Sequence, residues 1–116
     1  MFSIIIPTLN NLKYLSFCIN SLKKNSDNDN EILVHVSEDE DGETRNFLNK
    51  QNIKYTFSSE NVGLCTAINK VAKIASKDYL IYVHDDMYFC PGWEKPLINE
   101  IKSISHNNFY ISGTMI

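Results

Sequence analysis

Two adjacent carboxylates, Asp85 and Asp86, directly follow the apolar run Tyr79–Val83, which is typical of a buried strand. A second acidic cluster, Glu38–Asp41, follows another apolar run, Ile32–Val36. Clustered carboxylates repel one another unless a cation or a partner relieves them. Oxygen ligands gathered at one edge suit Mg²⁺ or Mn²⁺, which could bridge to a phosphate-bearing substrate. The clusters therefore indicate a divalent-metal site, although aspartates also commonly cap turns, and that alternative stays open.

Strand and helix patterns alternate along the chain and must position these acids. The predicted strands are Phe2–Ile6, stopped by Pro7, then Ile32–Val36, Lys54–Phe57, Tyr79–Val83 and Phe109–Ile111. The predicted helices are Leu12–Leu22, Glu43–Lys50, Leu64–Ala75 and Trp93–Ile104. Such alternation implies a parallel sheet with right-handed crossovers. Ligands of open α/β sheets bind outside the carboxyl ends of the strands, which is where both acidic clusters fall.

Composition limits the classes of function. The 116 residues fit one small globular domain, residues 1–116, with a modest core. The net charge is −3 and the eleven basic residues are scattered, which argues against a nucleic-acid partner. Three cysteines lie far apart without metal-ligand spacing, which favours reduced thiols and a cytoplasmic setting. No stretch approaches the roughly eighteen apolar residues that a transmembrane segment needs.

Four segments in order carry a resemblance to a known family. They are "FSIIIPTLN", "EILVHVSEDEDGET", "NVGLCTAIN" and "DYLIYVHDDMYFCPGW". Together they resemble the nucleotide-binding part of inverting family 2 glycosyltransferases. The resemblance implies a GT-A-like, Rossmann-type three-layer α/β/α sandwich with a mostly parallel sheet, truncated as the N-terminal part of a longer transferase.

The resemblance implies a metal site after the fourth long strand. Family members hold a divalent metal with the last Asp of an Asp-x-Asp motif, and that metal binds the donor diphosphate. Asp86 occupies this position, His84 occupies that of the first Asp, and Asp85 stands between them as a substitute. Imidazole accepts Mn²⁺ more readily than Mg²⁺. We therefore expect Mn²⁺ or Mg²⁺ at Asp86 and His84.

The resemblance also places residues of three turns around the nucleotide sugar. The expected set is Pro7, Thr8, Asn10, Glu38, Asp39, Asn61, Gly63, Asn69 and Asp85. Leu9 stands where the family has an aromatic residue, which weakens base stacking at that position. Three structural alternatives stay open: a simple strand stop for Pro7, a solvated surface for the acidic loop, and a buried hydrogen bond for Asn69.

The predicted function is glycosyl transfer from a nucleotide-diphosphate sugar, most commonly a UDP-sugar in such families, to an unknown acceptor. The alternative is a degenerate or truncated module that binds a nucleotide or a partner chain without catalysis, which His84, Leu9 and Ile68 favour as departures from the family pattern. Glu94 and Glu100 are the only carboxylates beyond the Asp85–Asp86 pair. Neither matches the family's base, so transfer by this chain alone is not expected.

The apolar ending "YISGTMI" has the composition of a strand inside a sheet. An exposed strand edge is a template for pairing with another chain. We therefore expect self-association, such as a homo-oligomer, through the C-terminal strand.

Overall fold

The computed structural model describes residues 1–113, in which four strands alternate with four helices. In chain order the elements are β1 (Phe2–Leu9), α1 (Leu12–Asn25), β2 (Glu31–Ser37), α2 (Glu43–Lys50), β3 (Lys54–Ser58), α3 (Leu64–Ala72), β4 (Tyr79–Tyr82) and α4 (Glu94–Ser103). All neighbouring strands are parallel, in the order β3-β2-β1-β4. The predicted alternation and the parallel sheet are confirmed.

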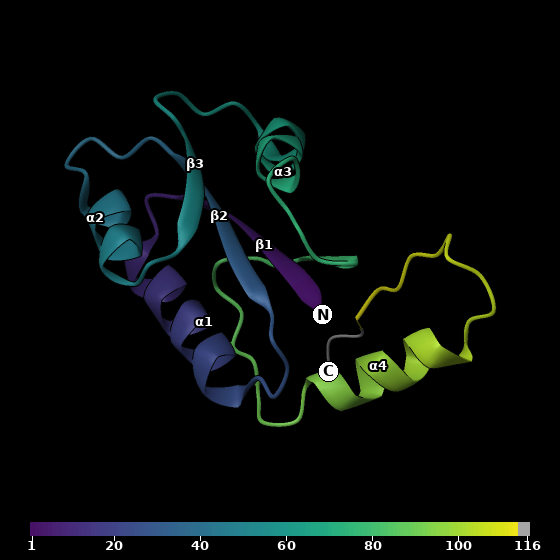
Figure 1. The fold of residues 1–116 in the computed structure, drawn as a ribbon. Helices are drawn as coiled ribbons and strands as arrows, with labels where there is room; N and C mark the ends of the chain where they lie inside the picture. Colours follow the sequence, from purple (N-terminus) through teal and green to yellow (C-terminus); the bar gives the residue numbers. More distant parts are fainter. Residues whose placement is uncertain (114–116) are drawn as a thin grey trace.

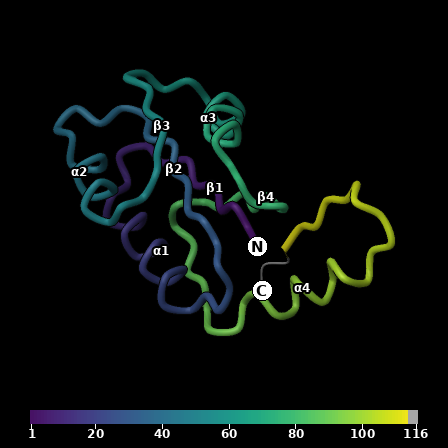
Figure 2. Tube along the Cα trace, viewed as in Figure 1, coloured from purple at the N-terminus to yellow at the C-terminus, as the bar shows by residue number. Residues whose placement is uncertain are grey.

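The helices form layers on both faces of the sheet. Helices α1 and α2 lie on one face and α3 lies on the other, while α4 lies at the far end of the molecule from α2 (Figure 1). Strand β4 lies beyond β1, and the chain after it runs back and then down toward α4 (Figure 2). This is the predicted three-layer α/β/α arrangement.

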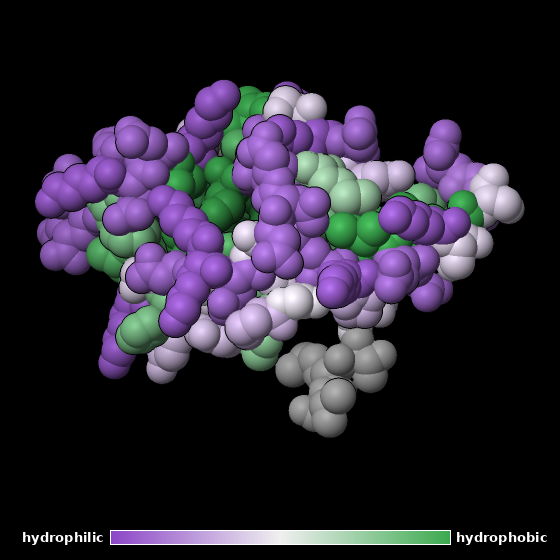
Figure 3. All heavy atoms as spheres, turned by 60° about the horizontal axis from the view of Figure 1, so that its bottom comes forward, coloured by the Kyte–Doolittle hydropathy of each residue, from purple (hydrophilic) through white to green (hydrophobic). Residues whose placement is uncertain are grey.

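Two apolar layers explain why the strand sequences are almost continuously apolar. Alternate residues of a strand point to opposite faces. Phe2, Ile4 and Ile6 of β1 join the larger core cluster, whereas Ile5 packs with Val71 of α3 on the other face. A strand covered on both faces needs apolar residues at nearly every position. The face shown in Figure 3 is mostly polar, with apolar side chains visible between the polar ones.

The prediction that Pro7 stops the first strand is wrong, because β1 continues to Leu9. Ile5 accepts a hydrogen bond from Val83 N–H, so the backbone groups of Ile5 face β4. Pro7, two residues on, faces the same way by the alternation of the strand. Strand β4 has already ended there, since its last residue, Tyr82, pairs with Ile5. The missing N–H of proline therefore costs no sheet hydrogen bond.

The predicted last strand, Phe109–Ile111, is also wrong, because this segment has no regular secondary structure. Phe109 packs against Tyr79 with 5.9 Å between the ring centroids, and Tyr110 is 91% exposed. The segment Phe109–Ile111 contributes apolar packing and no strand pairing, and self-association through the C-terminal segment stays a prediction. Residues 114–116 of the apolar ending lie outside the described residues.

The remaining differences are shifts of one to three residues at the ends of strands and helices: β4 ends at Tyr82 before the predicted Val83, and α1 runs to Asn25 beyond the predicted Leu22. Helix α3 ends at Ala72 where the apolar pattern predicted Ala75, and α4 covers Glu94–Ser103 within the predicted Trp93–Ile104. Among residues 1–113, every helix is too short or too polar to cross a bilayer.

Candidate functional site

A groove opens at the carboxyl edge of the sheet, between the ends of β1 and β4 and the start of α3. Its volume is about 320 Å³. Its walls are formed by Pro7, Thr8, Leu9, Asn11, Ser37, Asn61, Gly63, Leu64, Ala67, Tyr82, His84 and Asp85. Six of the predicted site residues therefore come together: Pro7, Thr8, Asn61, Gly63, His84 and Asp85. Asn10, Glu38, Asp39, Asn69 and Asp86 do not line this groove.

One hydrogen bond joins the two strand ends across the groove. The Thr8 hydroxyl donates to Asp85 Oδ2 at 2.8 Å, over 77 positions of sequence. The parallel pairing of β1 with β4 brings these residues together, since both follow the paired stretch of their strands. Thr8 is buried and Asp85 is half-buried, so the hydrogen bond holds the carboxylate in place in the groove wall.

The turn after β1 is made by a left-handed residue. Asn10 has φ of 47°, and the carbonyl of the next residue, Asn11, accepts the first hydrogen bond of α1, from Leu15 N–H. Asparagine tolerates this conformation better than most residues. The turn leaves the side chain of Leu9 42% exposed at the groove.

In the acidic loop after β2, the first two acids, Glu38 and Asp39, have different environments. Asp39 is buried, and its carboxylate accepts hydrogen bonds from the backbone N–H groups of Thr44 and Arg45 and from Arg45 Nε. Burial alone would raise the pKa of Asp39, but the hydrogen bonds from Arg45 and Thr44 outweigh it and lower the pKa. Asp39 therefore closes the start of α2, as an N-terminal capping residue does.

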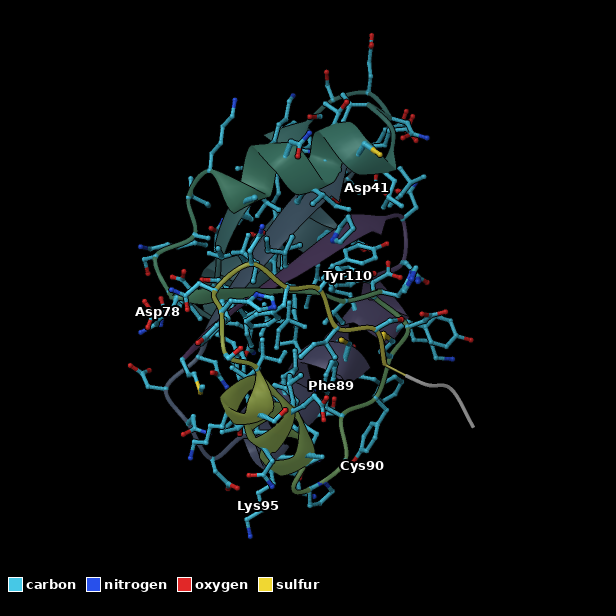
Figure 4. The ribbon with its side chains drawn as sticks, turned by 90° about the vertical axis from the view of Figure 1, so that its right-hand side faces the viewer. Asp41, Asp78, Phe89, Cys90, Lys95 and Tyr110 are labelled. Carbon is cyan, nitrogen blue, oxygen red and sulfur yellow. The ribbon has the colours of Figure 1, made fainter. Side chains whose placement is uncertain are left out.

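Glu38 differs from Asp39 in both backbone and side chain. Its φ is 51°, a left-handed conformation that costs free energy for a residue with a Cβ, and its N–H donates to Ser58 O. Its side chain accepts no hydrogen bond from the described residues. Figure 4 shows Asp41 of the same loop at this edge, with Asp78 at the opposite edge. Glu38 therefore differs from Asp39 in having no side-chain partner among the described residues, as do the exposed Glu40 and Asp41.

The third predicted turn shapes the start of α3. Gly63 has φ of 85° and ψ of 160°, a region that is essentially restricted to glycine. Its N–H donates to Asn61 Oδ1 at 3.0 Å, which fixes the turn. Asn69, one turn and a half further along α3, is exposed and outside the groove, so the buried hydrogen bond that its position allowed is not formed.

Sequence reasoning missed Tyr82, the last residue of β4. Its ring lines the groove and contacts His84 edge-on, with 5.0 Å between the centroids. Burial and the charge of Asp85 raise the pKa of the Tyr82 phenol. The sequence could have indicated Tyr82 as a site residue, because side chains alternate along a strand and Tyr82 therefore lies on the same face as the predicted residue His84.

The two adjacent carboxylates also lie close to α1. Cys18 is buried in α1 and its Sγ lies 3.9 Å from His84 O. Burial, with the charges of Asp85 and Asp86 added, raises the pKa of Cys18 to about 12. The thiol is therefore protonated at neutral pH.

The residues near the groove do not form a closed metal site. Within residues 1–113, no three His, Cys, Asp or Glu side chains come together as a cation site. Asp86 and His84 are both exposed. Mg²⁺-type sites commonly use one or two carboxylates together with substrate phosphates. The donor set here fits a cation shared with a bound diphosphate, and it does not fit a cation held by the protein alone.

Glu94, one of the two late carboxylates, lies away from this groove. It is 2% exposed, and its oxygens accept hydrogen bonds from the side chains of Asn28 and Asn30 at 2.9 Å each and from the backbone N–H of Asp27. These partners belong to the loop between α1 and β2, at the amino edge of the sheet. Glu94 is thus a structural residue.

Comparisons with known proteins place these features in a family. The model of the family described as Glycosyl transferase family 2 matches residues 3–113. No curated protein matches the chain. S. aureus TarS 1–349 is similar in structure, with a TM-score of 0.75, 24% identity, and coverage of 88% of this chain and 32% of that 1–349 chain.

Two further structures hold ligands. TarS 1–349 in complex with UDP has a TM-score of 0.74 at 25% identity, again covering 88% of this chain and 32% of that one. The mannosyltransferase PcManGT from Pyrobaculum calidifontis, in complex with GDP-Man and Mn²⁺, has a TM-score of 0.70 at 18% identity and covers 90% and 32%. The chain thus spans about a third of the length of these solved chains and 19% of the longer TarS chain, and their fold agrees with the predicted GT-A fold.

Proposed function

Because this chain belongs to glycosyl transferase family 2, we propose that its carboxyl-edge groove binds a nucleotide-diphosphate sugar through a divalent metal, for glycosyl transfer to an unknown acceptor. The observation that carries the proposal is the Thr8–Asp85 hydrogen bond, which fixes a carboxylate at the mouth of the groove. Asp86 follows it directly, exposed to an incoming ligand.

A divalent cation, Mn²⁺ or Mg²⁺, is the cofactor of this proposal. Asp86 would hold it, with His84 as the second protein ligand and the donor diphosphate completing the shell. The bound cation supplies charge for the diphosphate leaving group as the glycosidic bond breaks. The protein itself contributes the position of Asp85 through Thr8 and an exposed edge that the diphosphate can reach.

A UDP-sugar is the donor that we propose. TarS is a structural neighbour that binds UDP, and PcManGT binds GDP-Man with Mn²⁺. The Ser37 and Asn61 side chains in the groove offer hydrogen-bonding groups for a base or ribose. Glu38 lies one residue beyond the groove wall and is the acid available to add discrimination.

An inverting transfer also needs a base that deprotonates the acceptor hydroxyl. Glu94 does not take this role in our proposal, because its oxygens are used at the opposite edge of the sheet. The same observation favours a second candidate function, in which this chain binds the nucleotide and transfers nothing by itself.

Calorimetry with UDP, in Mn²⁺ and in chelator, tests the proposal on the 116-residue chain. We expect Mn²⁺ to strengthen binding, and Asp86→Asn to weaken it about tenfold to a hundredfold, more than Asp85→Asn. Asp78→Asn is the matched control, because Asp78 is exposed at the opposite edge (Figure 4). Metal-independent binding, or equal losses from the two groove variants, would contradict the assignment of the metal to Asp86.

The acidic loop is tested by separating its two acids. Glu38→Ala should leave folding unchanged and reduce the preference for UDP over GDP, since an unpaired polar group in a site discriminates between ligands. Asp39→Ala should instead lower the unfolding midpoint, because it removes the acceptor that closes the start of α2. Unchanged preference in the Glu38 variant would make this loop a solvated surface.

A further inference from the structure

Three apolar side chains stay exposed in the donor groove. Leu9 is 42% exposed, Leu64 is 52% exposed and Tyr82 is 39% exposed, and all three line the same 320 Å³ space. They come from the end of β1, the start of α3 and the end of β4. Tyr82 is the only one of them with a flat ring, and the position after Thr8, where an aromatic residue was expected, holds Leu9.

We infer that the ring of Tyr82 is the stacking surface for the nucleobase of the donor, with Leu9 and Leu64 as the apolar side of the same slot. The inference rests on the proposed function and assigns a residue to it. In this chain the aromatic surface comes from β4, whereas the family resemblance predicted an aromatic residue in the turn after β1.

The geometry of β4 supports the assignment. His84 meets the Tyr82 ring edge-on at an interplanar angle of 64°, so the two rings cannot both lie flat against one ligand. The edge-on contact restrains the Tyr82 ring, and a restrained aromatic ring loses little entropy when a ligand stacks on it.

Hydrogen-bonding groups lie in the same groove as the ring. Asp85 lines the groove, and its carboxylate accepts a hydrogen bond from the Thr8 hydroxyl. Ser37, at the end of β2, and Asn61, before α3, also line the groove and offer hydrogen-bonding groups to a base or ribose. A base stacked on Tyr82 therefore has polar partners within the same 320 Å³ space.

Leu80 offers a matched control for simple exposure. It lies two residues before Tyr82 on the same face of β4 and is 57% exposed, but it does not line the groove. If Tyr82 were exposed only because this face of β4 is uncovered, alanine substitutions of Tyr82 and Leu80 would have the same effect on the affinity for UDP.

The test measures two ligands on four proteins by calorimetry: UDP and inorganic pyrophosphate, each with Mn²⁺, on the unaltered chain, Tyr82→Ala, Tyr82→Phe and Leu80→Ala. We expect Tyr82→Ala to weaken UDP about tenfold or more, because base–aromatic stacking is worth that much in alanine substitutions. Tyr82→Phe and Leu80→Ala should stay within about twofold, since the stacking face is kept or not involved. Pyrophosphate, which has no base, should bind all four proteins alike.

Ligand NMR adds a readout that a structural role would not change. The uracil H5 and H6 signals of UDP should shift upfield in the unaltered chain and in Tyr82→Phe, because they lie over a ring, and this shift should vanish in Tyr82→Ala. Thermal unfolding of each variant establishes that it is folded. Equal losses for UDP and pyrophosphate, or a Tyr82→Ala affinity equal to that of Leu80→Ala, would overturn the inference while leaving the donor site intact. Failure of the unaltered chain to bind UDP would overturn the proposed function and this inference together.

Discussion

At the amino edge of the sheet, the carboxylates of Glu94 and Glu31 are held by several hydrogen bonds, whereas at the carboxyl edge Asp85 has one side-chain partner and Asp86 is exposed. Glu94 binds the loop between α1 and β2 through the side chains of Asn28 and Asn30. Glu31, the first residue of β2, accepts from the hydroxyls of Ser3 and Ser76. Glu94 thus holds the α1–β2 loop to the start of α4, and Glu31 holds the α3–β4 loop to the sheet beside Ser3 of β1.

At the carboxyl edge, Asp85 and Asp86 accept fewer hydrogen bonds from the protein, and the backbone is strained at several turns. Asn10 and Glu38 have positive φ, and Gly63 adopts a conformation essentially restricted to glycine. Among the described residues, Asp85 has one side-chain partner, Thr8, and Asp86 has none. Strain and open polar groups concentrate where a ligand completes the structure. The comparison teaches that one edge is held together by its own hydrogen bonds, whereas the other carries the groove that we propose binds the donor.

The largest expected effect is the loss of the amino-edge acid. Glu94→Ala removes a buried carboxylate whose charge-assisted hydrogen bonds hold the Asp27–Asn30 loop, and we expect it to lower the free energy of unfolding by about 3 kcal/mol. Urea unfolding measures this. Glu100→Ala, on the exposed side of the same helix, is the control and should change the free energy by less than about 0.5 kcal/mol. Similar values for the two variants would remove the distinction between the edges.

The same acid should give the protein an acid-dependent stability. Burial alone would raise the pKa of Glu94, but hydrogen bonds from Asn30 and Asn28 outweigh it and hold the pKa below its ordinary value of 4.5. A lowered folded pKa means that the stabilisation is fully present above pH 4.5 and is lost as the pH falls through the folded pKa. Urea midpoints between neutral pH and pH 3 should fall in the unaltered chain.

Glu94→Gln isolates this contribution, since the amide cannot titrate in that range. We expect a shallower fall for Glu94→Gln than for the unaltered chain. Part of the fall should remain, because the pKa values of Glu31 and Asp39 are also lowered by hydrogen bonds that outweigh burial. If the urea midpoints of the two proteins fall in parallel with pH, the charge of Glu94 does not contribute to stability.

At the carboxyl edge, Gly63→Ala should affect both stability and binding. Nothing lies within 4 Å of the added Cβ, so the cost is conformational and comes from φ of 85°. We expect a loss of about 1–3 kcal/mol of unfolding free energy together with weaker UDP binding. Gly92→Ala is matched, with φ of 79° and open space, but lies outside the groove. If it weakens UDP binding equally, Gly63 has no special part in the site.

The fold could be predicted from the sequence because its signals are local. Periodic apolar residues marked the four helices, and apolar β-branched runs marked β1 to β4. Pro7 was misjudged because its tolerance depends on where β4 ends, which is a property of the neighbouring strand. Phe109–Ile111 has a strand-like composition, but composition alone does not provide a pairing partner.

The candidate site was predictable in place and only partly in detail. The rule that parallel strands gather their carboxyl ends brought Thr8 and Asp85 together, as expected. The division between Asp39, which caps α2, and Glu38, which stays open, was not readable because both are acids in one loop. Tyr82 was passed over because an aromatic residue in a strand is most often packing. Only the groove itself shows that its ring is exposed.

The smallest expected effect has the opposite sign and concerns Glu38. Its left-handed backbone, with φ of 51°, is unfavourable for a residue with a Cβ, and glycine removes that cost. Glycine also increases the entropy lost on folding, so we expect Glu38→Gly to raise the unfolding free energy by no more than about 1 kcal/mol. Asn52→Gly is the control at the amino edge: its φ is 56°, but asparagine already tolerates this conformation, so its stability should change less.

The same substitution should also weaken the nucleotide preference of the proposed donor site. Glu38→Gly removes the open acid next to the groove, so the preference for UDP over GDP should narrow while the protein becomes slightly more stable. Asn52→Gly should leave that preference unchanged. Urea unfolding and calorimetry with both nucleotides measure the two quantities on the same samples. A Glu38→Gly protein that is less stable than the unaltered chain would mean that its strained backbone is offset by local contacts, and the carboxyl edge would then resemble the amino edge in being built for stability.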